Sequence, residues 1–177
     1  MKKPDLFVIG LACLLFSVAA PGDKPAPETM DKPPAAASVD KFRVGVRAFN
    51  ANQFTRAREL WLPLAESGDV RAQYAIGRLY EKGNGVERDL ETAISWYQKA
   101  ADRGHADSEY RLAVGYAYGM GIARDEAKAL SWLRRAANHG QKRAQKVLAQ
   151  AYKEGRLGLA ADPEQAQYWY DKANSGS

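Results

Sequence analysis

The side chains best suited to catalysis or metal binding are few in this sequence. One cysteine, Cys13, and two histidines, His105 and His139, supply every thiol and imidazole group among 177 residues. A single cysteine makes neither an internal disulfide nor a thiolate metal cluster, and no third ligand accompanies the two histidines at metal-site spacing. We therefore expect no metal site, and we expect both histidines to be turn residues at junctions between structural units.

Two short glycine motifs could be mistaken for phosphate-binding loops. They are Gly83-Asn84-Gly85 and Gly119-Met120-Gly121. Neither continues into Gly-Lys-Ser/Thr or follows a predicted strand, and no serine has the surroundings of a nucleophile elbow. We predict helix-ending turns at both motifs, no cofactor and no enzymatic activity.

The charge balance is mildly basic. The sequence contains 26 Lys and Arg against 21 Asp and Glu, which gives a formal net charge of +5 at pH 7. This modest excess favours acidic protein partners or anionic surfaces over nucleic acid.

The first 39 residues differ in composition from the rest. Residues 1–20 combine a basic start with an apolar run that is shorter than the ~20 residues of a membrane span, and they end in small residues. We interpret them as a cleaved signal peptide, with lipid attachment at Cys13 as the less favoured alternative. We therefore expect a periplasmic or secreted protein with no transmembrane span. Residues 21–39 hold five of the eight prolines and predict a flexible linker.

The remainder of the chain repeats with a period of 36 residues. Segments 70–105, 106–141 and 142–177 align, and a shorter unit over 40–69 keeps the same offset through Ala57 and Trp61. The shared columns are small, branched apolar, aromatic or glycine: Ala72/Ser108/Ala144, Ile76/Leu112/Leu148, Gly77/Ala113/Ala149, Tyr80/Tyr116/Tyr152, Gly83/Gly119/Gly155, Ala93/Ala129/Ala166 and Trp96/Trp132/Trp169. In the last two columns the residue of segment 142–177 is shifted by one position, which we interpret as a one-residue insertion in its middle loop. We predict an all-α, right-handed α-solenoid of about four antiparallel helix pairs, in which stacking of the pairs completes the core.

These columns resemble the Sel-one-like repeat family. The run from Ala75 to Asp89, followed by Ala93 and Trp96, carries the likeness, and residues 115–132 repeat it. Segment 142–177 diverges because Leu157 replaces the second glycine, and the leading unit is closer to an ordinary tetratricopeptide motif. The resemblance implies a tetratricopeptide-like solenoid that acts as a protein–protein scaffold or adaptor, often in the bacterial envelope. It implies no reaction.

In repeats of the tetratricopeptide type the first helix of each pair lines an inner groove. Removing the core columns leaves these inward-facing positions: Arg71, Tyr74, Arg78, Lys82, Asp107, Tyr110, Val114, Tyr118, Arg143, Lys146, Gln150 and Lys153. The basic residues and tyrosines among them are the candidate groove residues. Such a groove is basic at both ends with tyrosines between, so it suits carboxylates and offers rigid amphipathic faces. We predict binding of an acidic or C-terminal peptide segment, and an ordinary solvated helix surface remains the alternative.

The last repeat supplies a second candidate surface. Trp169 and Tyr170 lie in the final predicted helix, and no helix is predicted after it to cover them. We expect an exposed aromatic patch for a partner or for self-association, against the alternative of a solvated end. The competing functions are a peptidoglycan-associated binding protein or hydrolase regulator, and glycan stacking on Tyr74, Tyr110 and Tyr118.

Overall fold

The computed structural model describes residues 35–175, with side chains from residue 41 onward. This part of the chain lies within one compact unit and contains helices and no strands. The helices are α1 (Ala35–Asn50), α2 (Phe54–Glu66), α3 (Val70–Lys82), α4 (Leu90–Ala101), α5 (Ala106–Tyr118), α6 (Glu126–Asn138), α7 (Lys142–Glu154) and α8 (Pro163–Asn174). The all-α repeat fold predicted from the sequence is confirmed.

Helix α1 begins inside the segment predicted as linker. It starts at Ala35, so residues 35–39 are helical, and the leading helix pair is longer than the unit 40–69 expected from the sequence. The predicted signal peptide, Cys13 and the earlier part of the linker lie outside the described residues. No helix within residues 35–175 is long and apolar enough to cross a membrane.

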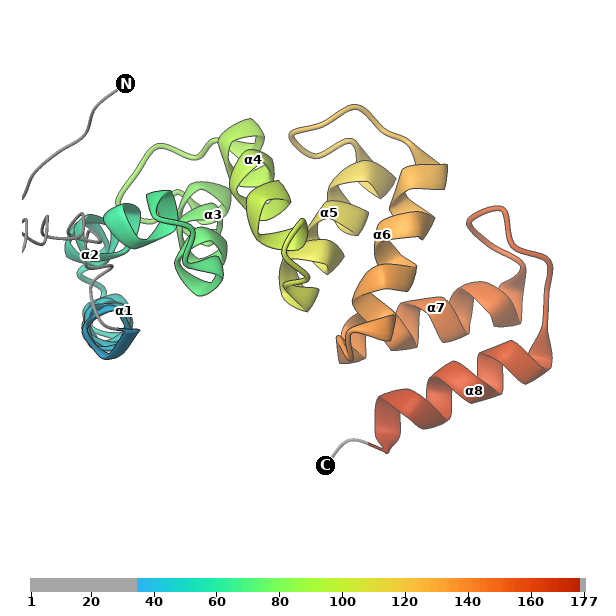
Figure 1. Cartoon of the computed structure of the whole chain (residues 1–177). Helices are drawn as coiled ribbons and strands as arrows, with labels where there is room; N and C mark the ends of the chain where they lie inside the picture. The colour runs from blue at the N-terminus through green and yellow to red at the C-terminus, as the bar shows by residue number, and fades with distance from the viewer. Residues whose placement is uncertain (1–34, 176–177) are drawn as a thin grey trace, which may run out of the picture. The chain divides into compact units, whose positions relative to one another are not determined.

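The helices form a single row of antiparallel pairs (Figure 1). Each helix packs extensively against the helices immediately before and after it in the chain. Packing that is mainly between neighbours is what a repeat array needs, because no pair buries its apolar face without the next.

The repeat columns form the core as predicted. The branched residues Ile76, Leu112 and Leu148 are fully buried in three successive odd-numbered helices. The small residues four positions earlier are fully buried as well: Ala72, Ser108 and Ala144. Each odd-numbered helix from α3 onward ends at a glycine in the left-handed region, Gly83, Gly119 or Gly155, which confirms the predicted turns.

Within each helix pair, a small residue of the first helix faces a large residue of the second. Gly45 faces Trp61 and Gly77 faces Tyr97. The corresponding residues of the next two pairs, Ala113 and Leu133, then Ala149 and Trp169, are buried in one cluster. A Cβ atom built on Gly77 would lie 2.6 Å from the Tyr97 ring, so the glycine is what allows a tyrosine here. Where the small residue is alanine, a leucine or a tryptophan fills the same place.

Trp169 corrects the sequence alignment of the last repeat. Its side chain is 7% exposed and packs in the same buried cluster as Ala149, so the predicted exposed patch does not include it. Trp96 and Trp132, the residues aligned with it, are only half-buried. By burial, Trp169 continues the column of Tyr97 and Leu133 at the plain 36-residue offset, because a large side chain is needed against Ala149. The exposed aromatic residues of α8 are Tyr168 and Tyr170, at 52% and 55%.

The Gly77–Tyr97 contact gives a direct test of this packing. Gly77→Ala should lower the free energy of unfolding by about 1–3 kcal/mol, because the added methyl overpacks against the tyrosine ring. Tyr97→Leu also removes the hydrogen bond to Glu81, so the coupling between the two changes is the informative quantity. Gly77→Ala should cost clearly less stability in the Tyr97→Leu background, where the pair matches the natural Ala113 and Leu133. Urea unfolding of the four proteins, followed by circular dichroism, measures both costs. An equal cost of Gly77→Ala in the two backgrounds would contradict the pairing.

Candidate functional site

The arginines predicted on α3 are engaged within the protein. Arg71 forms an ion pair with Asp69, with Nη2 2.7 Å from Oδ2, and its guanidinium lies 4.7 Å from the ring centre of Phe42. Arg78 is half-buried, and its guanidinium lies 5.9 Å from the rings of Phe49 and of Tyr74. The charge of Arg71 is thus compensated by Asp69 although its side chain is 46% exposed, and Arg78 packs against aromatic rings.

Tyr74 is likewise a packing residue. Its ring lies between those of Tyr97 and His105, with centroid distances of 5.7 and 4.8 Å. Tyr110 is half-buried, and only Tyr118 is broadly exposed, at 76%. The three tyrosines considered for glycan stacking therefore do not present a shared exposed platform.

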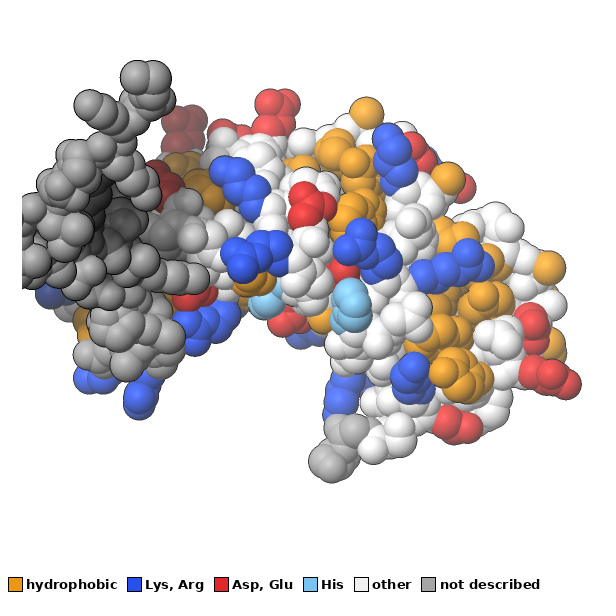
Figure 2. Space-filling model, in the orientation of Figure 1, with side chains coloured by type: hydrophobic (Ala, Val, Ile, Leu, Met, Phe, Trp, Pro, Cys, Tyr) orange, Lys and Arg blue, Asp and Glu red, His pale blue; other side chains and the backbone are white. Residues whose placement is uncertain are grey.

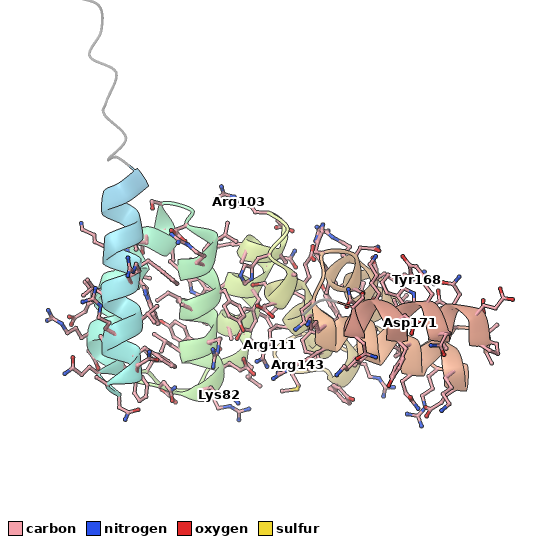
Figure 3. The ribbon with its side chains drawn as sticks, turned by 90° about the horizontal axis from the view of Figure 1, so that it is seen from below. Lys82, Arg103, Arg111, Arg143, Tyr168 and Asp171 are labelled. Carbon is pink, nitrogen blue, oxygen red and sulfur yellow. The ribbon has the colours of Figure 1, made fainter. Side chains whose placement is uncertain are left out.

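The basic residues at the other end of the predicted groove are available. Arg143, Lys146 and Lys153 project from α7, are exposed, and make no hydrogen bond or ion pair to the described residues that would neutralise them. Lys82 at the end of α3 is exposed in the same way. Figure 3 shows Lys82, Arg111 and Arg143 toward one side of the row of helices and Arg103 on the other.

A polar network joins the second helix pair to α5. The Tyr97 hydroxyl donates to Glu81 Oε2 at 2.6 Å, and Arg111 Nη1 donates to Glu81 Oε1 at 3.0 Å. Burial and the neighbouring carboxylate of Glu81 raise the pKa of the Tyr97 hydroxyl, so it stays protonated as a donor. Against the opposing effect of burial, the negative charge of Glu81 raises the pKa of Arg111. The space left at this junction is only about 30 Å³.

The next junction has no such network. Thirty-six residues on, Glu81, Tyr97 and Arg111 are replaced by Ala117, Leu133 and Val147. A pocket of about 120 Å³ lies here, with apolar walls from α5, α6 and α7. Its lining residues are Tyr110, Ala113, Val114, Ala117, Tyr118, Ala129, Leu133, Val147 and Leu157. Sequence reasoning missed this pocket, although the loss of three polar residues in register was a visible signal.

Leu157 is a further difference between this junction and the one before it. The corresponding Gly121 lies against the backbone of Leu90, where any Cβ atom would collide with the carbonyl oxygen. Leu157 has a φ of 56° and keeps the left-handed turn, but it carries a side chain. That side chain packs against the buried cluster and forms one wall of the pocket.

A buried carboxylate is the second feature that the sequence reading missed. Glu109 is fully buried and lies 3.2 Å from Arg135 Nε and 2.7 Å from His139 Nδ1. Its column holds Gln73 and Gln145, each of which donates through Nε2 to a backbone carbonyl, that of Ala65 or Ala137. In the middle repeat Arg135 Nη2 donates instead to the equivalent carbonyl of Ala101, at 3.3 Å.

Both histidines have structural positions at helix ends. His105 caps the N-terminus of α5, where its Nδ1 accepts from the backbone N–H of Ser108 at 3.3 Å. His139 caps the C-terminus of α6 beside Glu109. Burial lowers the pKa of His105 against the raising effect of Asp107 and Glu109, so the neutral ring that can accept this bond is favoured.

Comparison with known proteins finds the same repeat. A model of the Sel1 repeat matches residues 70–105, 106–141 and 142–176. A Sel1 repeat protein from Oxalobacter formigenes is 32% identical with a TM-score of 0.72, over 77% of this chain and 56% of that one. The c5321 protein, a protective antigen of uropathogenic Escherichia coli strains displaying an SLR fold, is 34% identical with a TM-score of 0.71, over 79% of this chain and 31% of that one.

A curated relative matches over a shorter stretch. The chitin synthase regulator SKT5 of Saccharomyces cerevisiae is 45% identical over 40 residues, which is 23% of this chain and 6% of that protein. The chain thus spans between 6% and 56% of the length of these relatives.

The Glu109 cluster predicts a non-additive pair of variants. Arg135→Ala should cost about 1–3 kcal/mol of stability, because it removes one of the partners of a buried carboxylate. In the Glu109→Gln background the loss should be clearly smaller, since a glutamine there can donate to the Ala101 carbonyl as Gln73 and Gln145 do in their repeats. Urea unfolding of the four proteins of the cycle measures the coupling. Equal losses of stability in the two backgrounds would show that Arg135 does not stabilise the buried Glu109 carboxylate.

The His105 cap predicts a dependence of stability on pH. Its folded pKa lies below the unfolded value of about 6.5, so its contribution is complete above pH 7 and decreases as pH falls toward the folded pKa. His105→Asn keeps an acceptor at the cap and does not titrate. The wild type should lose more stability than this variant between pH 7.5 and 5. His139 is present in both proteins, so its contribution is the same in each. Parallel curves of stability against pH would therefore show that the pH dependence does not come from His105.

Proposed function

Because the chain belongs to the Sel1 repeat family, whose repeats generally mediate protein–protein interaction and whose scaffold is generally non-catalytic, we propose that it is a non-enzymatic binding adaptor for an acidic peptide segment of another protein. The binding surface is the exposed basic face of α7 together with the adjoining part of α5. We define this α7 surface by Arg143, Lys146, Lys153 and Tyr118.

The observation that carries the proposal is the contrast between engaged and available cations. Arg71 forms an ion pair with Asp69, and Arg111 forms one with Glu81. Arg78 is half-buried against aromatic rings. Arg143, Lys146 and Lys153 have no acidic partner among residues 41–175. Exposed and unneutralised cations on one helix attract carboxylates and speed their association. The predicted groove is thus functional mainly at its α7 end.

The proposed setting is the cell envelope. It rests on the basic, apolar and small-residue pattern of residues 1–20, a pattern typical of a signal peptide, and on the proline-rich segment that follows. A reporter that is active only outside the cytoplasm, fused to this chain, tests this setting, because it should be active if the chain is exported. If Cys13 carries a lipid, the variant Cys13→Ser should lose membrane association, whereas a cleaved signal peptide predicts no such change.

Charge reversal on α7 tests the binding surface. Arg143→Glu/Lys146→Glu should weaken binding of fluorescein-labelled acidic peptides at least tenfold, because two attractive charges become repulsive. Fluorescence anisotropy at 50 and 300 mM salt measures it, and the wild-type affinity should fall as salt rises.

The matched control changes net charge equally on another surface. Arg56→Glu/Arg103→Glu alters exposed arginines on α2 and after α4, and Figure 3 shows Arg103 on the side away from Arg143. This control should bind nearly as the wild type does. Equal weakening in both double variants would show a general effect of net charge and would reject the α7 surface.

A further inference from the structure

The pocket at the junction of α5, α6 and α7 adds an apolar requirement to the proposed peptide site. We propose that it takes one leucine- or phenylalanine-sized side chain of the bound peptide, flanked by acidic residues that meet the cations of α7. This inference rests on the proposed function and specifies its ligand: an acidic segment with a single apolar anchor.

The first argument is the size and lining of the pocket. Its volume is about 120 Å³, four times the space at the upstream junction, and its walls come from alanine, valine, leucine and tyrosine side chains. An apolar cavity of this order accommodates a benzene-sized group, so it suits a branched aliphatic side chain or one aromatic ring. No charged side chain lines it.

The second argument is the exposure of its rim. Among the described residues, large apolar or aromatic side chains are broadly exposed at four places, and two of these border the pocket: Tyr118 at 76% and Val147 at 40%. The pocket is thus open to solvent. An exposed apolar rim beside charged groups is typical of a site where a partner's anchor residue is buried.

The third argument is charge complementarity around the opening. Arg143 is four residues before Val147 on α7, so it lies one helical turn away on the helix face that forms the pocket wall. Lys146, directly before Val147, lies beside this face and lines the neighbouring groove between α7 and α8 together with Lys153. The only acidic residue of α7, Glu154, is paired with Arg156. A peptide anchored in the pocket would therefore place its neighbouring residues among unneutralised positive charges, which selects carboxylates.

The repeat itself provides a natural closed form of the same site. At the upstream junction Glu81 and Arg111 occupy the positions of Ala117 and Val147. Their ion pair, together with the Tyr97 hydroxyl that donates to Glu81, fills the space. The variant Ala117→Glu/Val147→Arg transfers this pair to the pocket without changing the net charge. It should fill the pocket and leave the cations of α7 in place.

Fluorescence anisotropy with a defined peptide series tests the proposal. The probes are labelled pentapeptides Glu-Glu-X-Glu-Glu with X varied over Gly, Ala, Leu, Phe and Lys. Wild type should bind the Leu and Phe peptides at least tenfold tighter than the Ala and Gly peptides, because three or more buried carbon groups separate them. The pocket-filling variant should bind all five with affinities within about twofold of its Ala peptide.

The outcomes separate this inference from the proposed function. Binding that depends on Arg143 and Lys146 but not on X would overturn the pocket inference and leave the acidic-peptide function standing. No binding to any of the five peptides at millimolar concentration would overturn both. A preference for apolar X that survives Ala117→Glu/Val147→Arg would place the anchor elsewhere and reject the pocket.

A second measurement covers the case in which the pocket-filling variant folds poorly. In wild type, methyl resonances of Leu133 and Val147 should shift on addition of the Leu peptide and remain unshifted with the Gly peptide. The fully buried Leu148 methyls report on general perturbation. Shifts of equal size at Leu148 and Val147, or the same shifts with both peptides, would reject the pocket as the anchor site.

Discussion

The fold depends on one recurring contact, the fit of a small residue on an odd-numbered helix against a large residue on the helix that follows. In successive pairs the fit is Gly77 with Tyr97, Ala113 with Leu133 and Ala149 with Trp169. The small residue lets the two helices approach closely, and the large side chain of the following helix fills the space between them. The same constraint places Trp169 in the core even though its neighbours Tyr168 and Tyr170 are exposed.

That contact sets the spacing within a pair, so the residues at the junction between two pairs can differ in chemical type from one repeat to the next. One junction holds the polar network of Tyr97, Glu81 and Arg111, and the next has an apolar pocket at the same three positions. The buried Glu109 is a third variation, in which Arg135 takes over the carbonyl contact that a glutamine makes in the other repeats. Function can therefore be built into junctions while the repeat core stays unchanged. Figure 2 shows basic side chains lying next to apolar ones on one face of the row of helices.

The repeat columns predicted the helices, their terminal glycines and most of the core from the sequence. Ile76, Leu112 and Leu148 are buried where the 36-residue period placed them, since burial within a repeat follows local helical periodicity. The internal contacts of the candidate groove residues were not predicted from the sequence. Arg71 and Arg78 satisfy the pattern of an outward position, yet they contact Asp69, Phe42, Phe49 and Tyr74. Sequence spacing gives the face of a helix on which a residue lies, but it does not say which side chains from a neighbouring helix reach it.

The sequence by itself determined the period, the all-α class, the family and the shortage of groups suited to catalysis, because each of these depends on residue type and local order. Tertiary structure alone decided which cations remain unpaired, that Trp169 is buried, and that Ala117, Leu133 and Val147 surround a pocket. These properties depend on distances between atoms of different helices. Ala117, Leu133 and Val147 are far apart in the sequence, but the stacking of helix pairs brings them to the same junction, where together they line one pocket.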